Sequence, residues 1–311
     1  MTRVRMLFAA LLAAATLPGI SALTEGTGRW TAGAPMPSQR TEVAVAEIGG
    51  KIYVVGGFGG ERELEIYDPT ADRWSRGAPI PRELHHAAAV GLNGKLYVIG
   101  GYIEGWTPTA EVHEYDPASD RWQALAPMPT PRGALAAAVL DGKIYAVSGV
   151  GPGRRNTPAH EVYDPVTNQW TPRAPILTVR DHLAAAAAAG RLYAIGGRID
   201  GSYANNLAAN ETYDPASDRW ERRAPLPTAR SGIAATVLNG RILVVGGEAP
   251  SGTFNQVEAY DPKDDSWSSL APMPTPRHGL GAAAVGGLLY VIAGGPRPGA
   301  SASAANEIFM P

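Results

Sequence analysis

The sequence repeats itself at intervals of 44, 48, 48, 50 and 47 residues, measured between Trp30, Trp74, Trp122, Trp170, Trp220 and Trp267. A near-constant spacing of this length indicates one supersecondary unit that recurs along the chain. Two seven-residue segments each occur twice without change: DPASDRW begins at Asp116 and Asp214, and APMPTPR begins at Ala126 and Ala271. Identical local sequence predicts the same backbone at each copy.

Each unit has the pattern of four strands, here called a, b, c and d. Strands a and b meet at pairs such as Asn93-Gly94, which favour two-residue hairpins between antiparallel neighbours. Strand b is an almost unbroken apolar run ending in two glycines, as in KIYVVGG from Lys51, which is typical of a strand covered on both faces. The six alanines of residues 184–189 favour a helix by propensity. Their register nevertheless predicts strand a, where small side chains suit an innermost strand.

The first tryptophan belongs to a strand d that no unit precedes. Residues 29–37 read RWTAGAPMP, whereas the chain ends in NEIFMP, where Glu307 and Phe309 fill strand c positions and no strand d follows. We therefore expect the N-terminal segment to pair with the last unit, which closes the array and leaves no open sheet edge.

Composition and the N-terminus bear on partners and compartment. The net charge of -2 offers no basic surface for nucleic acid or anionic membranes, so neither is an expected partner. No cysteine is present, which excludes disulfides and thiolate chemistry. Residues 1–22 resemble a secretory signal peptide, with Arg3 and Arg5 before the apolar residues 6–17 and cleavage near Ala22. We expect a secreted or periplasmic chain without membrane insertion after cleavage; an uncleaved anchor or buried helix is the alternative.

The order of double glycine, tyrosine and tryptophan resembles the kelch repeat. The glycines are Gly56-Gly57, Gly100-Gly101, Gly196-Gly197, Gly246-Gly247 and Gly294-Gly295, with Ser148-Gly149 as the variant, and the tyrosines are Tyr67, Tyr115, Tyr163, Tyr213 and Tyr260. The resemblance covers residues 29–311 and implies an all-β, six-bladed β-propeller of four-stranded blades around a channel. We expect residues 23–311 to form this one domain and to act as a monomer.

In such a ring the d–a and b–c loops share one face. The turns of the other face hardly vary, whereas the b–c loops differ between blades, so we expect binding on the loop face. Large side chains of the types common in binding hot spots lie on the b–c loops: Arg62, Tyr102, Trp106, Arg154, Arg155, Arg198 and Tyr203, with Phe254 and Arg297. The alternative is that these aromatics cap the core and these arginines are only solvated.

Ten residues after each tryptophan the chain has Arg40, Leu84, Arg132, Arg180, Arg230 and Arg277. Guanidinium groups suit carboxylate or phosphate ligands, and the kelch resemblance implies that arginines near this face recognise acidic peptides. A repeated position also fits a scaffold role, in which each arginine bonds neighbouring backbone carbonyls.

The next two positions vary: Thr41-Glu42, His85-His86, Gly133-Ala134, Asp181-His182, Ser231-Gly232 and His278-Gly279. We expect Glu42, His85, His86 and His278 on one arc of the channel mouth, and Asp181 and His182 roughly opposite. Glu42, His86 and His182 are the candidates for acid and base chemistry. Because no tight spacing such as HExxH is present, the sequence predicts no metal and no other cofactor.

The sequence thus predicts an exported propeller that binds a protein segment or a carbohydrate, with an acidic ligand suiting the arginines, and that does not catalyse. The alternative is a mutarotase or epimerase for a sugar acid such as sialic acid, an activity that secreted six-bladed kelch proteins include. Copper oxidases of the family rely on a tyrosine linked to cysteine, which this chain lacks.

Overall fold

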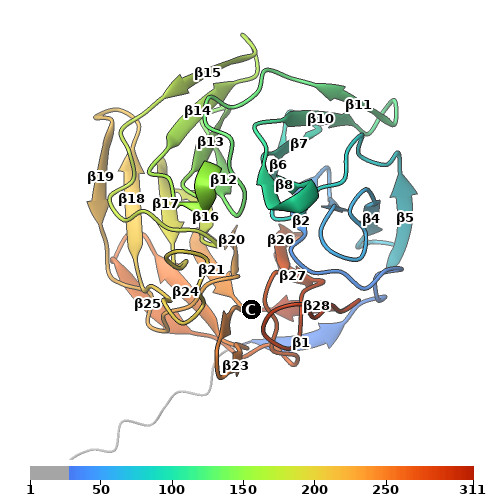
Figure 1. The fold of residues 1–311 in the computed structure, drawn as a ribbon. Coiled ribbons are helices and arrows are strands. Elements are labelled where there is room, and N and C mark those ends of the chain that lie inside the picture. Colours follow the sequence, from blue (N-terminus) through green and yellow to red (C-terminus); the bar gives the residue numbers. More distant parts are fainter. Residues whose placement is uncertain (1–27) are drawn as a thin grey trace, which may run out of the picture.

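The structure, a computed structural model, describes residues 28–311; the predicted signal peptide, residues 1–22, lies outside the described residues. Six four-stranded antiparallel sheets surround a central channel (Figure 1). The predicted all-β, six-bladed propeller is therefore confirmed. No helix among the described residues has the length and apolar character needed to cross a membrane.

Each blade runs from strand a at the channel to strand d at the rim. Blade 1 contains β2 (Ala44–Ile48), β3 (Lys51–Val55), β4 (Leu64–Asp68) and β5 (Arg73–Gly77). Blade 2 contains β6 (Ala88–Leu92), β7 (Lys95–Ile99), β10 (Val112–Asp116) and β11 (Arg121–Ala124). Blade 3 contains β12 (Ala136–Leu140), β13 (Lys143–Val147), β14 (His160–Asp164) and β15 (Gln169–Pro172).

The other three blades follow the same plan. Blade 4 contains β16 (Ala184–Ala188), β17 (Arg191–Ile195), β18 (Asn210–Asp214) and β19 (Arg219–Arg222). Blade 5 contains β20 (Ala234–Leu238), β21 (Arg241–Val245), β24 (Val257–Asp261) and β25 (Ser266–Ser269). Blade 6 contains β26 (Gly281–Val285), β27 (Leu288–Ile292), β28 (Asn306–Met310) and β1 (Arg29–Ala32). The b–c loops carry β8 (Tyr102–Ile103), η1 (Glu104–Trp106), β9 (Thr107–Pro108), η2 (Pro152–Arg154), β22 (Glu248–Ala249) and β23 (Gly252–Thr253).

The two ends of the described chain close the ring. Strand β1 pairs antiparallel with β28, with Trp30 opposite Phe309, and the two rings lie 5.1 Å apart between centroids (Figure 1). The N-terminal strand thus completes the last blade, as the sequence predicted. The alanine run also forms the predicted strand β16, whose buried alanines pack between neighbouring blades.

A repeated alanine joins each of the first five blades to its predecessor. Between blades 1 and 2, the Ala78 N–H donates to Asp120 Oδ1 at 2.6 Å, and Trp122 Nε1 donates to the Ala78 carbonyl at 2.7 Å. Asp120 also accepts a 2.6 Å hydrogen bond from the Tyr115 hydroxyl. The joint therefore needs the alanine of the Ala-Pro motif, the aspartate and tryptophan of the Asp-Arg-Trp motif and the tyrosine of strand c. This shared requirement explains why these residues recur in the repeats.

The joint into blade 6 departs from this pattern in two linked positions. Gly28 stands where the others have Asp or Asn, and Phe309 stands where they have tyrosine, so neither the acceptor nor the hydroxyl is present. Only the tryptophan bond remains, from Trp30 Nε1 to the Ala271 carbonyl at 2.8 Å. A Cβ on Gly28 would lie 2.2 Å from the Phe309 ring, so the glycine makes room for that ring.

These joints make stability sensitive to acid. The Tyr115 hydroxyl and the Ala78 N–H lower the pKa of Asp120, and the aspartates at the equivalent joints, Asp72, Asp218 and Asp265, also have lowered pKa values. A carboxyl group with a lowered pKa contributes stability above its unfolded pKa, and that stability is lost as pH falls through the folded pKa.

Blade 3 supplies a natural control, because Asn168 accepts the same two bonds without titrating. We expect the fourfold variant D72N/D120N/D218N/D265N to lose less stability than the parent between about pH 5 and pH 2. Urea unfolding followed by circular dichroism at several pH values measures this difference. Parallel stability curves for the two proteins would contradict the assignment.

Candidate functional site

Each blade contributes two facing residues to the channel mouth on the loop face. One follows the repeated arginine position and the other is the third residue after the end of strand b. They form isolated antiparallel bridges: Thr41 with Phe58, His85 with Tyr102, Gly133 with Val150, Asp181 with Arg198, Ser231 with Glu248, and His278 with Gly295. The d–a and b–c loops therefore share one face, as expected. The backbone pairing is uniform, so the side chains alone give the mouth its chemistry.

A ring of six residues with left-handed backbone narrows the channel below these pairs: Glu42, His86, Ala134, His182, Gly232 and Gly279, with φ between 51° and 66°. Each N–H donates to the carbonyl of the ring residue in the preceding blade, over 2.7 to 3.1 Å, and the six bonds form a closed circle. This conformation costs non-glycine residues about 1–2 kcal/mol. Glutamate and histidine at such positions point to a use for their side chains.

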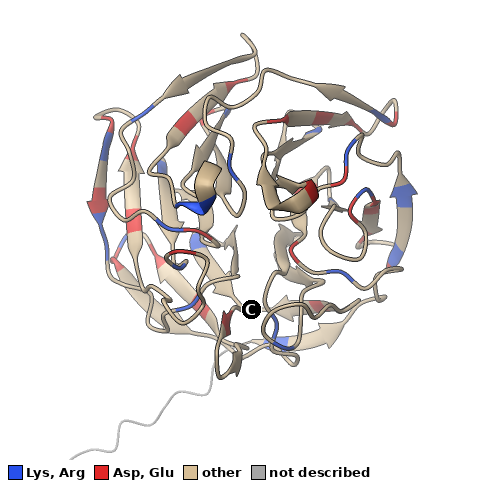
Figure 2. Cartoon of the chain, in the orientation of Figure 1, with Lys and Arg blue, Asp and Glu red and all other residues tan. Residues whose placement is uncertain are grey.

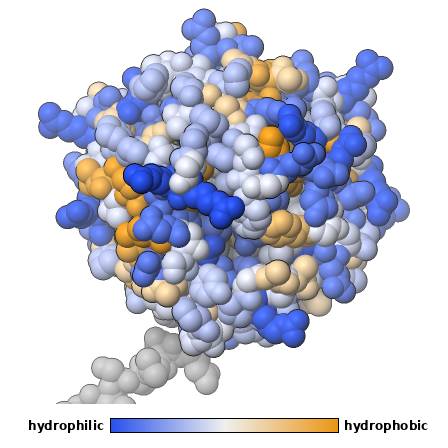
Figure 3. Space-filling view, viewed as in Figure 1, coloured by the Kyte–Doolittle hydropathy of each residue, from blue (hydrophilic) through white to orange (hydrophobic). Residues whose placement is uncertain are grey.

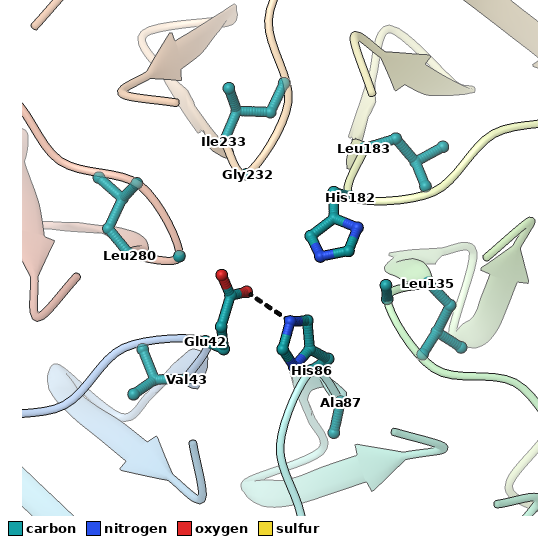
Figure 4. A pocket seen from close by; sticks show the side chains of 12 residues that line it. Glu42, Val43, His86, Ala87, Leu135, His182, Leu183, Gly232, Ile233 and Leu280 are labelled. Carbon is teal, nitrogen blue, oxygen red and sulfur yellow. Dashed lines mark ion pairs between the residues drawn. The ribbon is translucent and has the colours of Figure 1, made fainter. Parts of the chain in front are cut away.

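The carboxylate of Glu42 lies between two histidines. Its Oε2 is 3.3 Å from His86 Nε2, and its Oε1 is 3.3 Å from His278 Nδ1. His85 Nδ1 in turn lies 2.6 Å from His86 Nδ1. Figure 4 shows Glu42, His86 and His182 directed into the same space, and the His86 and His182 ring centroids are 5.0 Å apart. As expected, His182 comes from the blade opposite Glu42, and the ring is so narrow that polar atoms of Glu42, His86 and His182 still lie within 4.8 Å of one another.

Burial and charge shift the pKa values of this cluster in different directions. Burial would raise the pKa of Glu42, but the surrounding imidazoles of His86, His278 and His182 hold it well below its usual range. Burial lowers the pKa of His86 to about 3, against the opposing effect of the Glu42 carboxylate. Burial also acts to lower the pKa of His278, yet the carboxylates of Glu42 and Glu248 raise it above its usual value.

Arg198 links the remaining polar groups. Its guanidinium donates to Glu248 Oε1 at 2.6 Å and to Asp181 Oδ1 at 3.3 Å, and one N–H faces His182 Nε2 at 2.7 Å. Because a guanidinium only donates, His182 Nε2 carries the lone pair and its Nδ1–H donates to Asp181 at 2.5 Å. The guanidinium carbon also lies 5.6 Å from the centroid of the Tyr203 ring. His182 is thereby held in one tautomer and one orientation.

A cavity of about 320 Å³ opens beside this network. Its lining residues are Tyr102, Trp106, Val150, Arg154, His182, Arg198, Asp200 and Gly201. Trp106, at the end of η1, remains 46% exposed, and its ring packs on His85 with centroids 4.7 Å apart. Charged residues occur near the channel as well as along the outer strands (Figure 2), and the space-filling view shows hydrophilic residues over the middle of the molecule (Figure 3).

Comparison with known proteins is decisive for the family. Residues 67–222 and 162–309 match the KLHDC2/KLHL20/DRC7 Kelch-repeats domain, and residues 39–81 match the Kelch motif. The chain belongs to the kelch-repeat family. The solved structure of YjhT is similar to this kelch propeller, with a TM-score of 0.77 and 17% sequence identity. The match covers 88% of this chain and 95% of that chain. At this identity the similarity supports the fold alone. No curated protein matches the chain.

The five repeated arginines of the kelch propeller do not reach the mouth. Arg40, Arg132, Arg180, Arg230 and Arg277 are fully buried. Each pairs with the strand c glutamate of its own blade: Glu65, Glu161, Glu211, Glu258 and Glu307. Arg132, for example, lies 2.5 Å from Glu161 Oε2 and donates to the Ala146 carbonyl at 3.1 Å. These contacts favour the scaffold interpretation and remove the five arginines from the candidate binding site.

Blade 2 replaces both partners of this buried ion pair. Leu84 stands at the arginine position, and His113 stands at the glutamate position of strand c. Both are buried, and His113 Nε2 lies 3.0 Å from Glu111 instead. The paired exchange indicates that arginine and glutamate are needed for each other, since either charge alone would be buried without a partner.

Only some of the b–c loop residues predicted to bind a ligand line the cavity. Tyr102, Trp106, Arg154 and Arg198 line the cavity, and Tyr203 lies against Arg198. Arg155 is exposed and outside the cavity lining. Arg62 is also exposed and donates to the Ile80 carbonyl at 3.1 Å.

The sequence reasoning missed Glu248, which is buried at the mouth of the kelch propeller. It follows Gly246-Gly247, in the same register as Tyr102 and Arg198 in their blades. That shared register is the signal that would have identified it.

Replacing one member of the buried ion pair tests its structural role. We expect R132L to lower the free energy of unfolding by about 3–5 kcal/mol, because Glu161 is left buried without a partner. The double variant R132L/E161H copies the combination of blade 2 and should recover much of that loss. Guanidinium unfolding measures both. A single variant as stable as the parent would show that the ion pair is not needed.

Proposed function

We propose that this kelch propeller binds a carbohydrate in the cavity between Trp106 and Arg154. The proposal rests on one observation: the exposed indole of Trp106 and the charged side chains of Arg154 and Asp200 line the same cavity. A sugar ring presents C–H groups on its faces, which pack on aromatic rings, and hydroxyls at its edges, which hydrogen-bond to arginine, aspartate and histidine. The cavity volume lies at the lower end of the range for small-molecule sites, which suits one or two sugar rings.

The charges of the cavity favour an anionic sugar. Arg198 is already paired with Asp181 and Glu248. Arg154, by contrast, is exposed and makes no ion pair with any carboxylate in residues 28–311. Its guanidinium is free to make paired hydrogen bonds with the carboxylate of a sugar acid. A cavity of about 320 Å³ could hold a single side chain of a protein segment but not an extended segment. With the expected signal peptide, we place this binding in a secreted or periplasmic protein.

Neighbouring arginines provide a matched test of the binding proposal. We expect W106A to weaken the binding of its sugar at least about 10-fold, because the stacking surface is lost. R154Q should weaken the binding of sugar acids more than that of neutral sugars, whereas R155Q, outside the cavity, should leave both unchanged. Glycan-array screening followed by isothermal titration calorimetry measures these affinities. Binding of acidic peptides but of no glycan would contradict the proposal.

A second candidate function is mutarotation of the bound sugar. The observation that favours it is the oriented dyad of Asp181 and His182 on the cavity wall. Arg198 donates to the Nε2 lone pair of His182, so a bound sugar has to displace this contact before Nε2 accepts its proton. Opening of a sugar ring at the anomeric carbon requires removal of the anomeric hydroxyl proton and protonation of the ring oxygen.

NMR exchange spectroscopy on the anomers of a bound sugar acid tests this activity. The parent protein should accelerate interconversion of the anomers, and H182Q should reduce the acceleration about 100-fold or more while the sugar still binds. An interconversion rate equal to that in buffer, at saturating sugar, would exclude mutarotation and leave the binding proposal intact.

A further inference from the structure

His278 faces two carboxylates without hydrogen-bonding to either. Its side chain is 2% exposed, and Nδ1 lies 3.3 Å from Glu42 Oε1 and 3.6 Å from Glu248 Oε2. Within residues 28–311 this buried Nδ1 has no partner that meets hydrogen-bond geometry. The other ring nitrogen, Nε2, lies 3.1 Å from the Arg297 carbonyl, to which it can only donate. In the neutral imidazole, a lone pair on Nδ1 therefore points between two carboxylates.

The charges around this point do not balance. Glu42, Asp181 and Glu248 carry three negative charges in a region that is at most 11% exposed, and Arg198 supplies the one permanent positive charge among them. Two negative charges are left over. Uncompensated charge in a buried site is expensive, so a cation is needed there. A proton on His278 would supply one charge, whereas a divalent ion supplies both.

The two distances from His278 Nδ1, 3.3 Å to Glu42 Oε1 and 3.6 Å to Glu248 Oε2, match ligand separations around a tetrahedral metal ion, and all three ligand atoms lie within 4.8 Å of one another. Nitrogen and oxygen ligands at 2.0–2.2 Å from a tetrahedral ion lie about 3.3–3.6 Å from one another. We propose that Glu42 Oε1, Glu248 Oε2 and His278 Nδ1 bind a divalent transition-metal ion of the zinc class. Such an ion would supply the partner that Nδ1 lacks and would lie close to both carboxylates.

The surroundings of the three ligand atoms have the features of a metal site. His278 donates its second nitrogen to a backbone carbonyl, as metal-bound histidines usually do. Each carboxylate uses its other oxygen for a basic side chain: Glu42 Oε2 faces His86, and Glu248 Oε1 accepts from Arg198. Both carboxylates are thereby fixed in orientation.

The local backbone leaves space for this arrangement. Gly279 has φ of 58°, and a Cβ there would lie 2.6 Å from Glu42 Oε1, so a larger residue would displace the carboxylate. The channel cavity of about 90 Å³ is lined in part by Glu42 and Gly279 and is large enough to hold water beside the Glu42 carboxylate. Three protein ligands and one open position are the pattern of zinc sites that bind a further molecule.

Titration of untagged, chelator-treated protein with Zn²⁺ tests this inference. We expect one Zn²⁺ per chain by isothermal titration calorimetry, and binding at least about 100-fold weaker in both E248Q and H278Q. E104Q, which alters an exposed glutamate of η1, and W106A, which alters the proposed sugar cavity, should bind Zn²⁺ like the parent. Co²⁺ should give the visible absorption of a tetrahedral site in the parent and not in H278Q.

Two outcomes would overturn the metal site. One is folded parent protein that binds neither Zn²⁺ nor Co²⁺ up to millimolar concentration, which would assign the compensating charge to a proton on His278. The other is one-to-one binding that E248Q and H278Q both leave unchanged, which would place the ion elsewhere. Circular dichroism establishes folding of each variant. W106A is expected to weaken sugar binding and to leave Zn²⁺ binding unchanged. The metal-binding test therefore stays valid even if the protein binds no carbohydrate.

Discussion

The circle of six backbone hydrogen bonds around the channel is the constraint on which the site depends. It can exist only in a ring with no gap, and pairing of β1 with β28 removes the gap. The circle imposes left-handed backbone on one residue per blade and sets how far apart those residues lie. Side chains from opposite blades, Glu42 and His182 among them, consequently face a shared space only a few ångströms across.

The propeller separates scaffold from chemistry by position within the repeat. The alanine joints and the buried arginine–glutamate pairs recur because every blade must pack on its neighbours in the same way. The mouth positions keep the same backbone bridges but change side chains from blade to blade. Blade 2 shows the limit of this freedom, since its buried pair changes only as a unit, from arginine and glutamate to Leu84 and His113.

Two chemically different regions adjoin at the mouth. The cavity beside Trp106 is aromatic and carries the unpaired Arg154, which suits an anionic ligand. The adjoining cluster of Glu42, Asp181 and Glu248 holds an excess of buried carboxylates, which suits a cation. Arg198 and His182 lie at the boundary, because both line the cavity and both contact Asp181. A ligand in the cavity would thus lie next to groups whose charge and protonation are set by the ring.

Periodicity and turn dipeptides determined the number of repeats, their strands and the closing strand, because these follow from register along the chain. The kelch resemblance implied the ring and hence the face on which the loops gather. Periodicity also placed arginines and histidines at the correct positions in the repeat. Only the tertiary structure decided where those side chains point. The arginine side chains point into their own blades, where each forms an ion pair with Glu65 or its counterpart. Glu248, which belongs to no recognised motif, lies close to Glu42 and His278. Such meetings depend on the diameter of the closed channel, a property of six blades together that no single repeat contains.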